Sequence, residues 1–99
     1  QDLWQPAVLR LLHMVGDAGR RAGKPVGVCG EAAADPALAA VLVGLGVTSL
    51  SMALRALEPV RRALARVTVE DCRRAAEAAL ASSGPAAARE EVSRVLEMR

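Results

Sequence analysis

The stretch Gly23-Lys-Pro-Val-Gly-Val-Cys-Gly-Glu31 decides the fold, because a helix ends, a strand begins and two reactive side chains follow within it. Gly23 suits the end of a helix, since glycine readily adopts the left-handed conformation of a helix C-cap. Residues 25–29 form a short apolar run without polar alternation, which is typical of a parallel strand covered on both faces. The stretch therefore predicts a strand that ends in a thiol, Cys29, and is followed by a carboxylate, Glu31.

The residues that follow predict one strand–helix–strand unit over 25–52. Asp35-Pro36 places an N-cap residue before a proline at the first helical position. The helix over 36–44 is apolar on nearly every side, which indicates a helix buried all round. A second strand is predicted over 47–52. Because a 99-residue chain has little protein to cover such a helix, we expect a parent protein or a second copy to cover it.

Four further helices are predicted around this unit. One follows Pro6, one opens at Pro59, one starts at the capping box Thr68-Val-Glu-Asp71, and one follows the break before Pro85. The residues predicted to face inward are Val8, Leu11, Leu12, Val15, Ala18 and Ala22 in the first helix, Val60, Ala63, Leu64 and Val67 in the second, Val69, Cys72, Ala76, Ala79 and Leu80 in the third, and Ala88, Val92, Val95 and Leu96 in the last. Surface ion pairs are expected for His13 with Asp17 and for Glu90 with Arg94, and a solvated basic face for Arg61, Arg62 and Arg66.

Composition favours a small domain with reduced cysteines over a nucleic-acid-binding, zinc-binding or membrane-spanning protein. The formal net charge is +2, and arginines alternate with acidic residues, so we expect no nucleic-acid binding. The two cysteines lie far apart with no histidine at ligand spacing, which disfavours a zinc site and suits a cytoplasmic protein. The apolar run over 36–47 is too short to span a bilayer, so no membrane partner is expected. Since the chain starts at Gln1, we interpret it as a piece of a larger protein.

Taken alone, the reactive side chains are weak evidence for catalysis. His13 lacks partners and is best explained as a surface residue. Cys72 lies on an apolar helix face, where a free cysteine behaves as a small hydrophobe. Cys29 by itself would also be interpreted as a core thiol.

A family resemblance changes the interpretation of Cys29. Gly27-Val-Cys-Gly-Glu31 resembles the active-site loop of phosphoenolpyruvate-utilising enzymes. The wider set is similar to the C-terminal end of enzyme I of the bacterial sugar phosphotransferase system, the phosphoenolpyruvate–protein phosphotransferases. The motifs that carry this likeness are Leu3-Trp-Gln-Pro6, Val8-Leu9, Gly23-Lys-Pro25, Cys29-Gly-Glu31, Asp35, Leu45-Gly-Val47 and Leu50-Ser-Met52.

The resemblance implies an α/β fold, namely part of a (β/α) TIM-type barrel with its last two strand–helix units plus C-terminal helices. Residues 1–99 would then be a C-terminal fragment of a phosphoenolpyruvate-binding domain, because a full barrel takes about 250 residues. Magnesium ligands and the phosphorylated histidine would lie outside the chain, so no metal ligand is assigned and His13 is not the phosphorylated residue. A homodimer is also expected.

The resemblance also implies a role for each residue of the loop. Cys29 would be a general acid that protonates the enolate carbon, since a thiol is protonated at neutral pH yet can give up its proton. Gly30 would let the backbone approach the substrate, and Glu31 would orient or tune the thiol. The chain departs from the family pattern at Ala32-Ala-Ala-Asp35, where a glycine is lost, and at Ala53, where a serine is usual.

Two classes of function therefore remain open. The first is an enzyme fragment that moves the phosphoryl group of phosphoenolpyruvate to an enzyme histidine and then to a histidine-containing phosphocarrier protein, releasing pyruvate. Pyruvate phosphate dikinase and phosphoenolpyruvate synthase are close alternatives within this class. The second is a non-catalytic, self-associating module in which the apolar helix over 36–45 forms the contact and Cys29 is inert. In either case the isolated fragment is expected to have no turnover.

Overall fold

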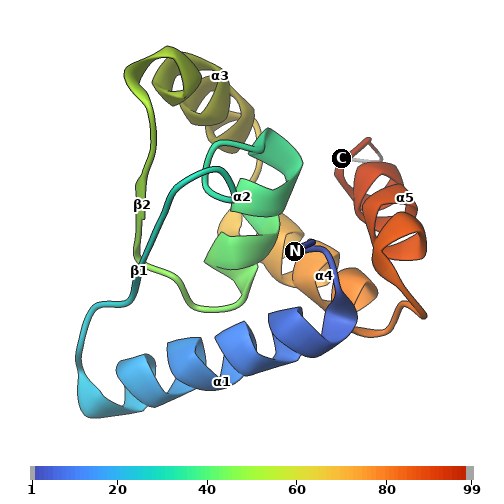
Figure 1. The fold of residues 1–99 in the computed structure, drawn as a ribbon, viewed down its shortest axis with the longest axis horizontal. Coiled ribbons are helices and arrows are strands. Elements are labelled where there is room, and N and C mark those ends of the chain that lie inside the picture. Colours follow the sequence, from blue (N-terminus) through green and yellow to red (C-terminus); the bar gives the residue numbers. More distant parts are fainter. Residues whose placement is uncertain (1, 98–99) are drawn as a thin grey trace.

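The computed structural model describes residues 2–97 as five helices around one short pair of strands. The elements in chain order are α1 (Pro6–Ala22), β1 (Gly27–Cys29), α2 (Pro36–Gly44), β2 (Ser49–Ser51), α3 (Leu54–Ala65), α4 (Val69–Leu80) and α5 (Pro85–Glu97). Figure 1 shows α2 near the middle, with the strands on one side of it and α4 and α5 on the other. The described residues are therefore mostly helical, with a single parallel pair of strands.

The two strands pair in parallel, as the strand–helix–strand pattern predicts. Their register sets Gly27 opposite Ser49, Val28 opposite Leu50, and Cys29 opposite Ser51. Below the ladder, the Thr48 hydroxyl accepts a hydrogen bond from the backbone N–H of Val26 at 2.9 Å. Both strands are shorter than the ranges 25–29 and 47–52 predicted from the sequence.

The prediction that the first strand is covered on both faces is wrong. Val28 and Leu50 are half-buried and pack against the core, whereas the other strand residues are exposed. This difference follows from the alternation of side chains along a strand, because α2 covers one face only. The exposed face carries Gly27, Cys29, Ser49 and Ser51.

Helix α2 is buried by the chain itself, so the expectation that a parent protein or second copy must cover it is also wrong. Residues Leu38 to Leu42 are at most 3% exposed. The cover comes chiefly from α4, with further contacts from α3 and α5. Close approach is possible because Gly44 lies against the backbone of α4: a Cβ there would be 2.1 Å from the carbonyl oxygen of Cys72.

Helix α1 exposes more apolar surface than its pattern predicts. Its buried residues are Pro6, Leu9 and Gly16, whereas Leu11 and Val15 are exposed. Figure 1 shows that α1 lies along one margin of the molecule and that its C-terminal part extends past α2. The predicted inward face of this helix is therefore largely wrong.

Helix α3 begins at Leu54, so Pro59 lies inside the helix and does not open it. The residues before the proline are good helix formers, and Pro59 removes only the bond that its own N–H would make to the carbonyl of Arg55. Its inward residue Val60 is buried. The basic residues Arg61, Arg62 and Arg66 are exposed, as predicted.

The last two helices agree with the sequence in their starts. The capping box is confirmed, with the Thr68 hydroxyl accepting from the N–H of Asp71 at 3.0 Å and Asp71 accepting from the N–H of Thr68 at 2.9 Å. Helix α5 starts at Pro85 and buries Ala88 and Val92. One predicted inward residue of α4 is wrong, since Val69 is 56% exposed.

The predicted surface ion pairs differ in their partners. Arg94 pairs with Glu91 at 2.6 Å and not with Glu90. Asp17 pairs with Arg20 and Arg21, which lie one turn after it in α1, whereas the predicted partner His13 lies one turn before it.

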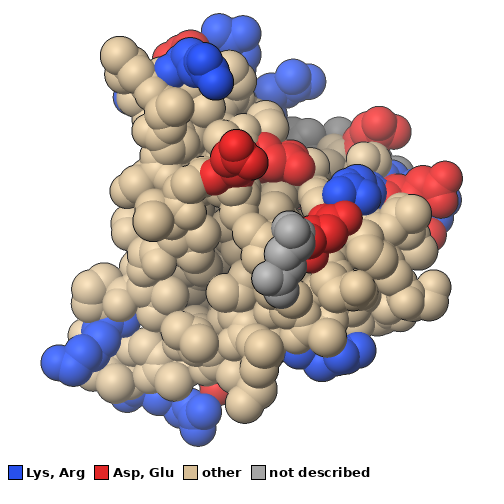
Figure 2. Space-filling model, in the orientation of Figure 1, with Lys and Arg blue, Asp and Glu red and all other residues tan. Residues whose placement is uncertain are grey.

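Charge is dispersed over the face that Figure 2 shows. Several Lys and Arg groups lie at its upper and lower margins, another lies beside acidic groups right of the middle, and most of the surface is uncharged. The basic groups therefore form no continuous patch on this face. No helix within residues 2–97 is long and apolar enough to cross a bilayer.

Candidate functional site

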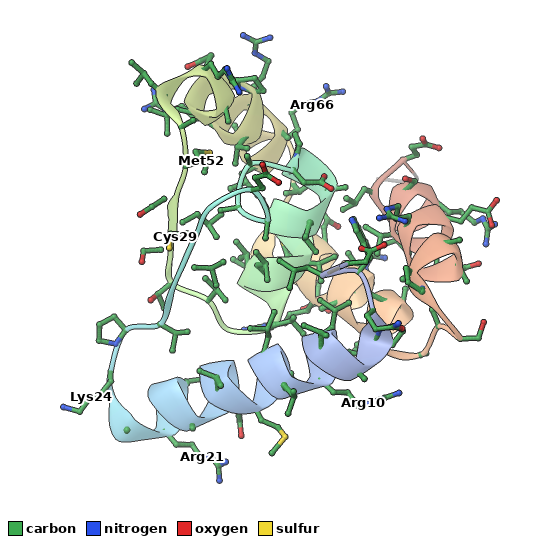
Figure 3. All side chains as sticks on the ribbon, in the orientation of Figure 1. Arg10, Arg21, Lys24, Cys29, Met52 and Arg66 are labelled. Atoms are coloured by element: carbon green, nitrogen blue, oxygen red, sulfur yellow. The ribbon has the colours of Figure 1, made fainter. Side chains whose placement is uncertain are left out.

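Cys29 is the last residue of β1 and its side chain is exposed. The ladder continues for one more bond, from the N–H of Gly30 to the carbonyl of Ser51 at 3.1 Å. In Figure 3 Cys29 lies at the end of β1, and Met52 lies just after the end of the neighbouring strand β2. The thiol therefore lies at the edge where both strands terminate, on the face that α2 does not cover.

Gly30 has a φ of +98°, in the left-handed region that disfavours side chains. The chain turns here, and nothing lies within 4 Å of the position where a Cβ would be. Glycine is thus required at this position by the backbone conformation and not by lack of space. Its role in letting the backbone approach a ligand stays a prediction.

The loop over 30–34 is a compact turn between β1 and the start of α2. The N–H of Ala34 donates to the carbonyl of Glu31 at 3.1 Å, and the side chain of Ala33 is fully buried. Asp35 ends the loop and caps α2 by accepting from the N–H groups of Ala37 and Leu38 at 3.1 and 3.3 Å. The alanines that depart from the family pattern are therefore accommodated in a packed, hydrogen-bonded turn.

Two of the predicted residues, Cys29 and Glu31, are among those that line an open depression of about 700 Å³. Its lining residues come from the N-terminal segment, the end of β1, the following loop, the first turn of α2 and α5. They are Asp2, Leu3, Trp4, Cys29, Glu31, Ala32, Asp35, Leu38 and Arg89. The depression thus combines a thiol, carboxylates and one arginine.

The wall contributed by Trp4 and Arg89 was not predicted from the sequence. Arg89 pairs with Asp2 at 2.8 Å, and its guanidinium lies 5.8 Å from the centre of the Trp4 ring. A hydrogen bond from the backbone N–H of Trp4, together with Arg89, lowers the pKa of Asp2 below its ordinary value. The only signal in the sequence was that Trp4 is the sole aromatic residue, since no local spacing relates residues 2 and 89.

The remaining candidate side chains lie elsewhere. Cys72 is 2% exposed, and burial, with a smaller effect of Asp71, raises the pKa of its thiol. This confirms its prediction as a core residue. His13 is exposed on α1. Within residues 2–97, no three His, Cys, Asp or Glu side chains gather in a way that could hold a metal ion.

Comparison with known proteins defines the class. The sequence model of a family described as "PEP-utilising enzyme, PEP-binding domain" matches residues 1–69. The chain therefore belongs to the PEP-utilising enzymes, in their PEP-binding domain.

Individual relatives narrow the likeness to the phosphoenolpyruvate-protein phosphotransferases. The protein of that name from Streptomyces coelicolor is 53% identical over 96 residues, which is 97% of this chain and 17% of that protein. The one from Geobacillus stearothermophilus is 40% identical over 77 residues, 78% of this chain and 13% of that protein. A Salmonella typhimurium protein named phosphoenolpyruvate-dependent phosphotransferase system is 34% identical over 98 residues, 99% of this chain and 13% of that protein.

These matches confirm the predicted resemblance to the C-terminal phosphoenolpyruvate-binding part of enzyme I. The chain spans only 13–17% of the length of these three relatives. What the whole relatives do is therefore carried to this chain only as a proposal.

Proposed function

We propose that this chain is part of a phosphotransferase that moves the phosphoryl group of phosphoenolpyruvate to an enzyme histidine and then to a histidine-containing phosphocarrier protein, with release of pyruvate. The family match and the names of the relatives support the substrate. The observation that carries the role of this chain is the exposed thiol of Cys29 at the carboxyl end of β1, in one depression with Glu31.

We further propose that β1 and β2 are two neighbouring strands of a (β/α) barrel. In such a barrel helices cover the outer face of the strands, and the opposite face is the interior. The parallel pairing supports this, as does the contrast between Val28, which packs toward the core, and Cys29, which faces away. Cys29 would then line the barrel interior at its carboxyl end, where the active sites of barrels lie.

The proposed chemistry of Cys29 is proton delivery to carbon. Once the phosphoryl group has left, the enolate of pyruvate carries negative charge on its methylene carbon. The S–H bond breaks, a C–H bond forms, and the products are pyruvate and a thiolate, which solvent reprotonates. An exposed thiol at the rim of a depression can reach a bound carbon atom in a way that a buried thiol such as Cys72 cannot.

Gly30 and Glu31 would assist this step from the same loop. Gly30 has no side chain and open space around its Cα, so a ligand can come close to the backbone. Glu31 lines the depression with Cys29 and would orient or electrostatically tune the thiol.

Magnesium does not fit the residues described here. The acidic side chains in the depression besides Glu31 are Asp2, which pairs with Arg89, and Asp35, which caps α2. We therefore place the ligands of this cofactor outside the described residues and derive no step through it.

These observations favour the phosphotransferase over the two alternative functions. Pyruvate phosphate dikinase or phosphoenolpyruvate synthase would suit the family match, but the relatives named above are phosphotransferases. A self-associating module based on α2 loses its contact surface, because that helix is buried within the chain. The proposed homodimer rests on the resemblance alone, and the proposed cytoplasmic location rests on the two widely separated cysteines, which suit a reducing compartment.

The test uses the full-length protein with Cys29→Ala, and Cys72→Ala as the control that removes the other thiol. We expect Cys29→Ala to slow pyruvate formation by about 100- to 10,000-fold, the usual range for losing a general acid. A single turnover should still phosphorylate the enzyme histidine, since that transfer precedes protonation. Unchanged pyruvate formation in Cys29→Ala would rule out the acid role, and transfer of phosphate to AMP or inorganic phosphate in place of the carrier protein would favour the alternatives.

A further inference from the structure

The carboxylate of Asp35 makes one hydrogen bond more than its helix requires. One oxygen, Oδ1, accepts from the N–H groups of Ala37 and Leu38 and so caps α2. The other, Oδ2, accepts from the indole Nε1–H of Trp4 at 3.2 Å. The second bond joins residues that are 31 apart in the sequence and links the N-terminal segment to the end of the loop over 30–34.

We propose that Trp4 and Asp35 are positioning residues for Cys29 and Glu31, and that their hydrogen bond holds the loop over 30–34 in its working place. This inference rests on the proposed function of that loop. We call the bond from Trp4 Nε1 to Asp35 Oδ2 the indole clamp.

The loop is held at its two ends and, between them, by the buried side chain of Ala33. At its start, the N–H of Gly30 donates to the carbonyl of Ser51, and at its end stands Asp35. Between them, Glu31 is exposed, and within residues 2–97 its side chain has no hydrogen-bond or ion-pair partner. The direction of Glu31 is therefore set by the backbone that carries it, which the indole clamp holds at its far end.

Trp4 is itself firmly placed, so it can serve as a fixed point. Its ring is 4% exposed, and a buried indole N–H needs an acceptor, which Asp35 supplies. Its backbone N–H donates to Asp2 at 2.9 Å, and Arg89 of α5 lies over its ring while pairing with Asp2. Helix α5 thereby helps to hold Trp4 against the loop.

The clamp also lies where it would control the reaction geometry. Trp4 and Asp35 line the same depression as Cys29 and Glu31, so their distance helps to set its width. A misplacement of about 1 Å in a reacting group can cost roughly 100-fold in rate. Losing this hydrogen bond should therefore lower kcat more than it weakens substrate binding.

The experiment uses full-length protein with Trp4→Phe and Asp35→Asn. Phenylalanine keeps a buried ring but lacks the indole N–H. Asparagine caps a helix about as well as aspartate, but it has only one carboxamide oxygen. That oxygen can accept from the cap N–H groups or from the indole, but the other partner then faces an NH₂ group. The control is Glu90→Gln, an exposed change on α5 outside the depression. We expect each clamp variant to lower kcat by about 10- to 100-fold with a smaller change in KM, and the control to match the parent.

Two readouts separate positioning from a loss of folding. Amide hydrogen exchange should speed up over 30–34 in both clamp variants, with little change in α4. The double variant should lose little more than either single variant, because both remove the same bond. The proposal is overturned if Cys29→Ala is inactive while both clamp variants keep normal kcat, or if exchange over 30–34 is unchanged. If Cys29→Ala itself keeps full turnover, the proposed function has failed, and faster exchange in the clamp variants would then still support the mechanical role of the bond.

Discussion

Replacing Gly44 by alanine should destabilise the fold through a single steric conflict between α2 and α4. The new Cβ would stand 2.1 Å from the carbonyl oxygen of Cys72, 2.6 Å from its carbonyl carbon and 2.9 Å from the Cβ of Ala76. Normal contacts between such atoms are about 3.5–4.0 Å. Because two of the three atoms belong to the backbone of a helix, a rotamer change cannot relieve the conflict, and the helices must move apart by roughly an ångström.

The net effect can be estimated from opposing terms. Overpacking of a well-filled interface costs about 1–3 kcal/mol, and backbone atoms favour the upper end of that range. Alanine recovers at most about 1 kcal/mol of helix propensity relative to glycine. We therefore expect the free energy of unfolding to fall by about 2 kcal/mol, which for a domain of this size lowers the melting temperature by roughly 8–16 °C.

The assay is urea or thermal unfolding followed by far-UV circular dichroism, with Gly84→Ala as the matched control. At Gly84 nothing lies within 4 Å of the new Cβ, so the same chemical change should alter stability by less than about 1 kcal/mol. If Gly44→Ala unfolds at the same urea concentration as the parent chain, the close approach of α2 to α4 is not as described and the reasoning fails.

Three further predictions concern the thiols, a cap and acid. A thiol reagent should modify Cys29 rapidly and Cys72 only after unfolding, because one is exposed and the other is 2% exposed; two equally fast thiols in the native chain would contradict this. Thr68→Ala should lower the free energy of unfolding by about 1 kcal/mol, whereas Thr68→Ser should retain the cap and most of the stability. Asp2 and Asp71 have a lowered pKa in the folded chain, so the unfolded chain binds protons more readily, and the stability that these carboxylates add is present above about pH 4 and lost as the pH falls through their folded pKa. Urea unfolding at a series of pH values measures this loss, and a midpoint that does not fall in acid would refute it.

Local signals were sufficient for most of the element starts. The cap at Asp35 and the capping box at Thr68 depend on side chains within three residues of the backbone groups they bind, so the sequence carries all the information. The parallel pairing of the strands also followed from one strand–helix–strand pattern. Pro59 misled the start of α3, because the good helix formers before it outweigh one missing hydrogen bond.

Burial was harder to predict, since it depends on which elements meet. The apolar pattern of α2 indicated full burial but could not say that α4 of the same chain would supply most of the cover. For α1 the pattern indicated a buried face, yet much of that face, including Leu11 and Val15, is exposed. The alternation of side chains along β1 turns Val28 toward the core and Cys29 away from it, which composition alone would not reveal.

The candidate site was predicted in part. Cys29, Gly30 and Glu31 were found because they are adjacent in the sequence and resemble a known loop. The indole clamp and the pairing of Arg89 with Asp2 join segments 31 and 87 residues apart, and only the packed structure brings them together.

The dependence of α2 on α4 bears on how this region should be excised for study. The family match ends at Val69, the first residue of α4, whereas most of the contacts that cover α2 come from this helix. A fragment trimmed to the matched length would expose much of the apolar surface of α2 to water and would tend to aggregate. A fragment that is to fold must therefore extend well beyond the last residue of the family match.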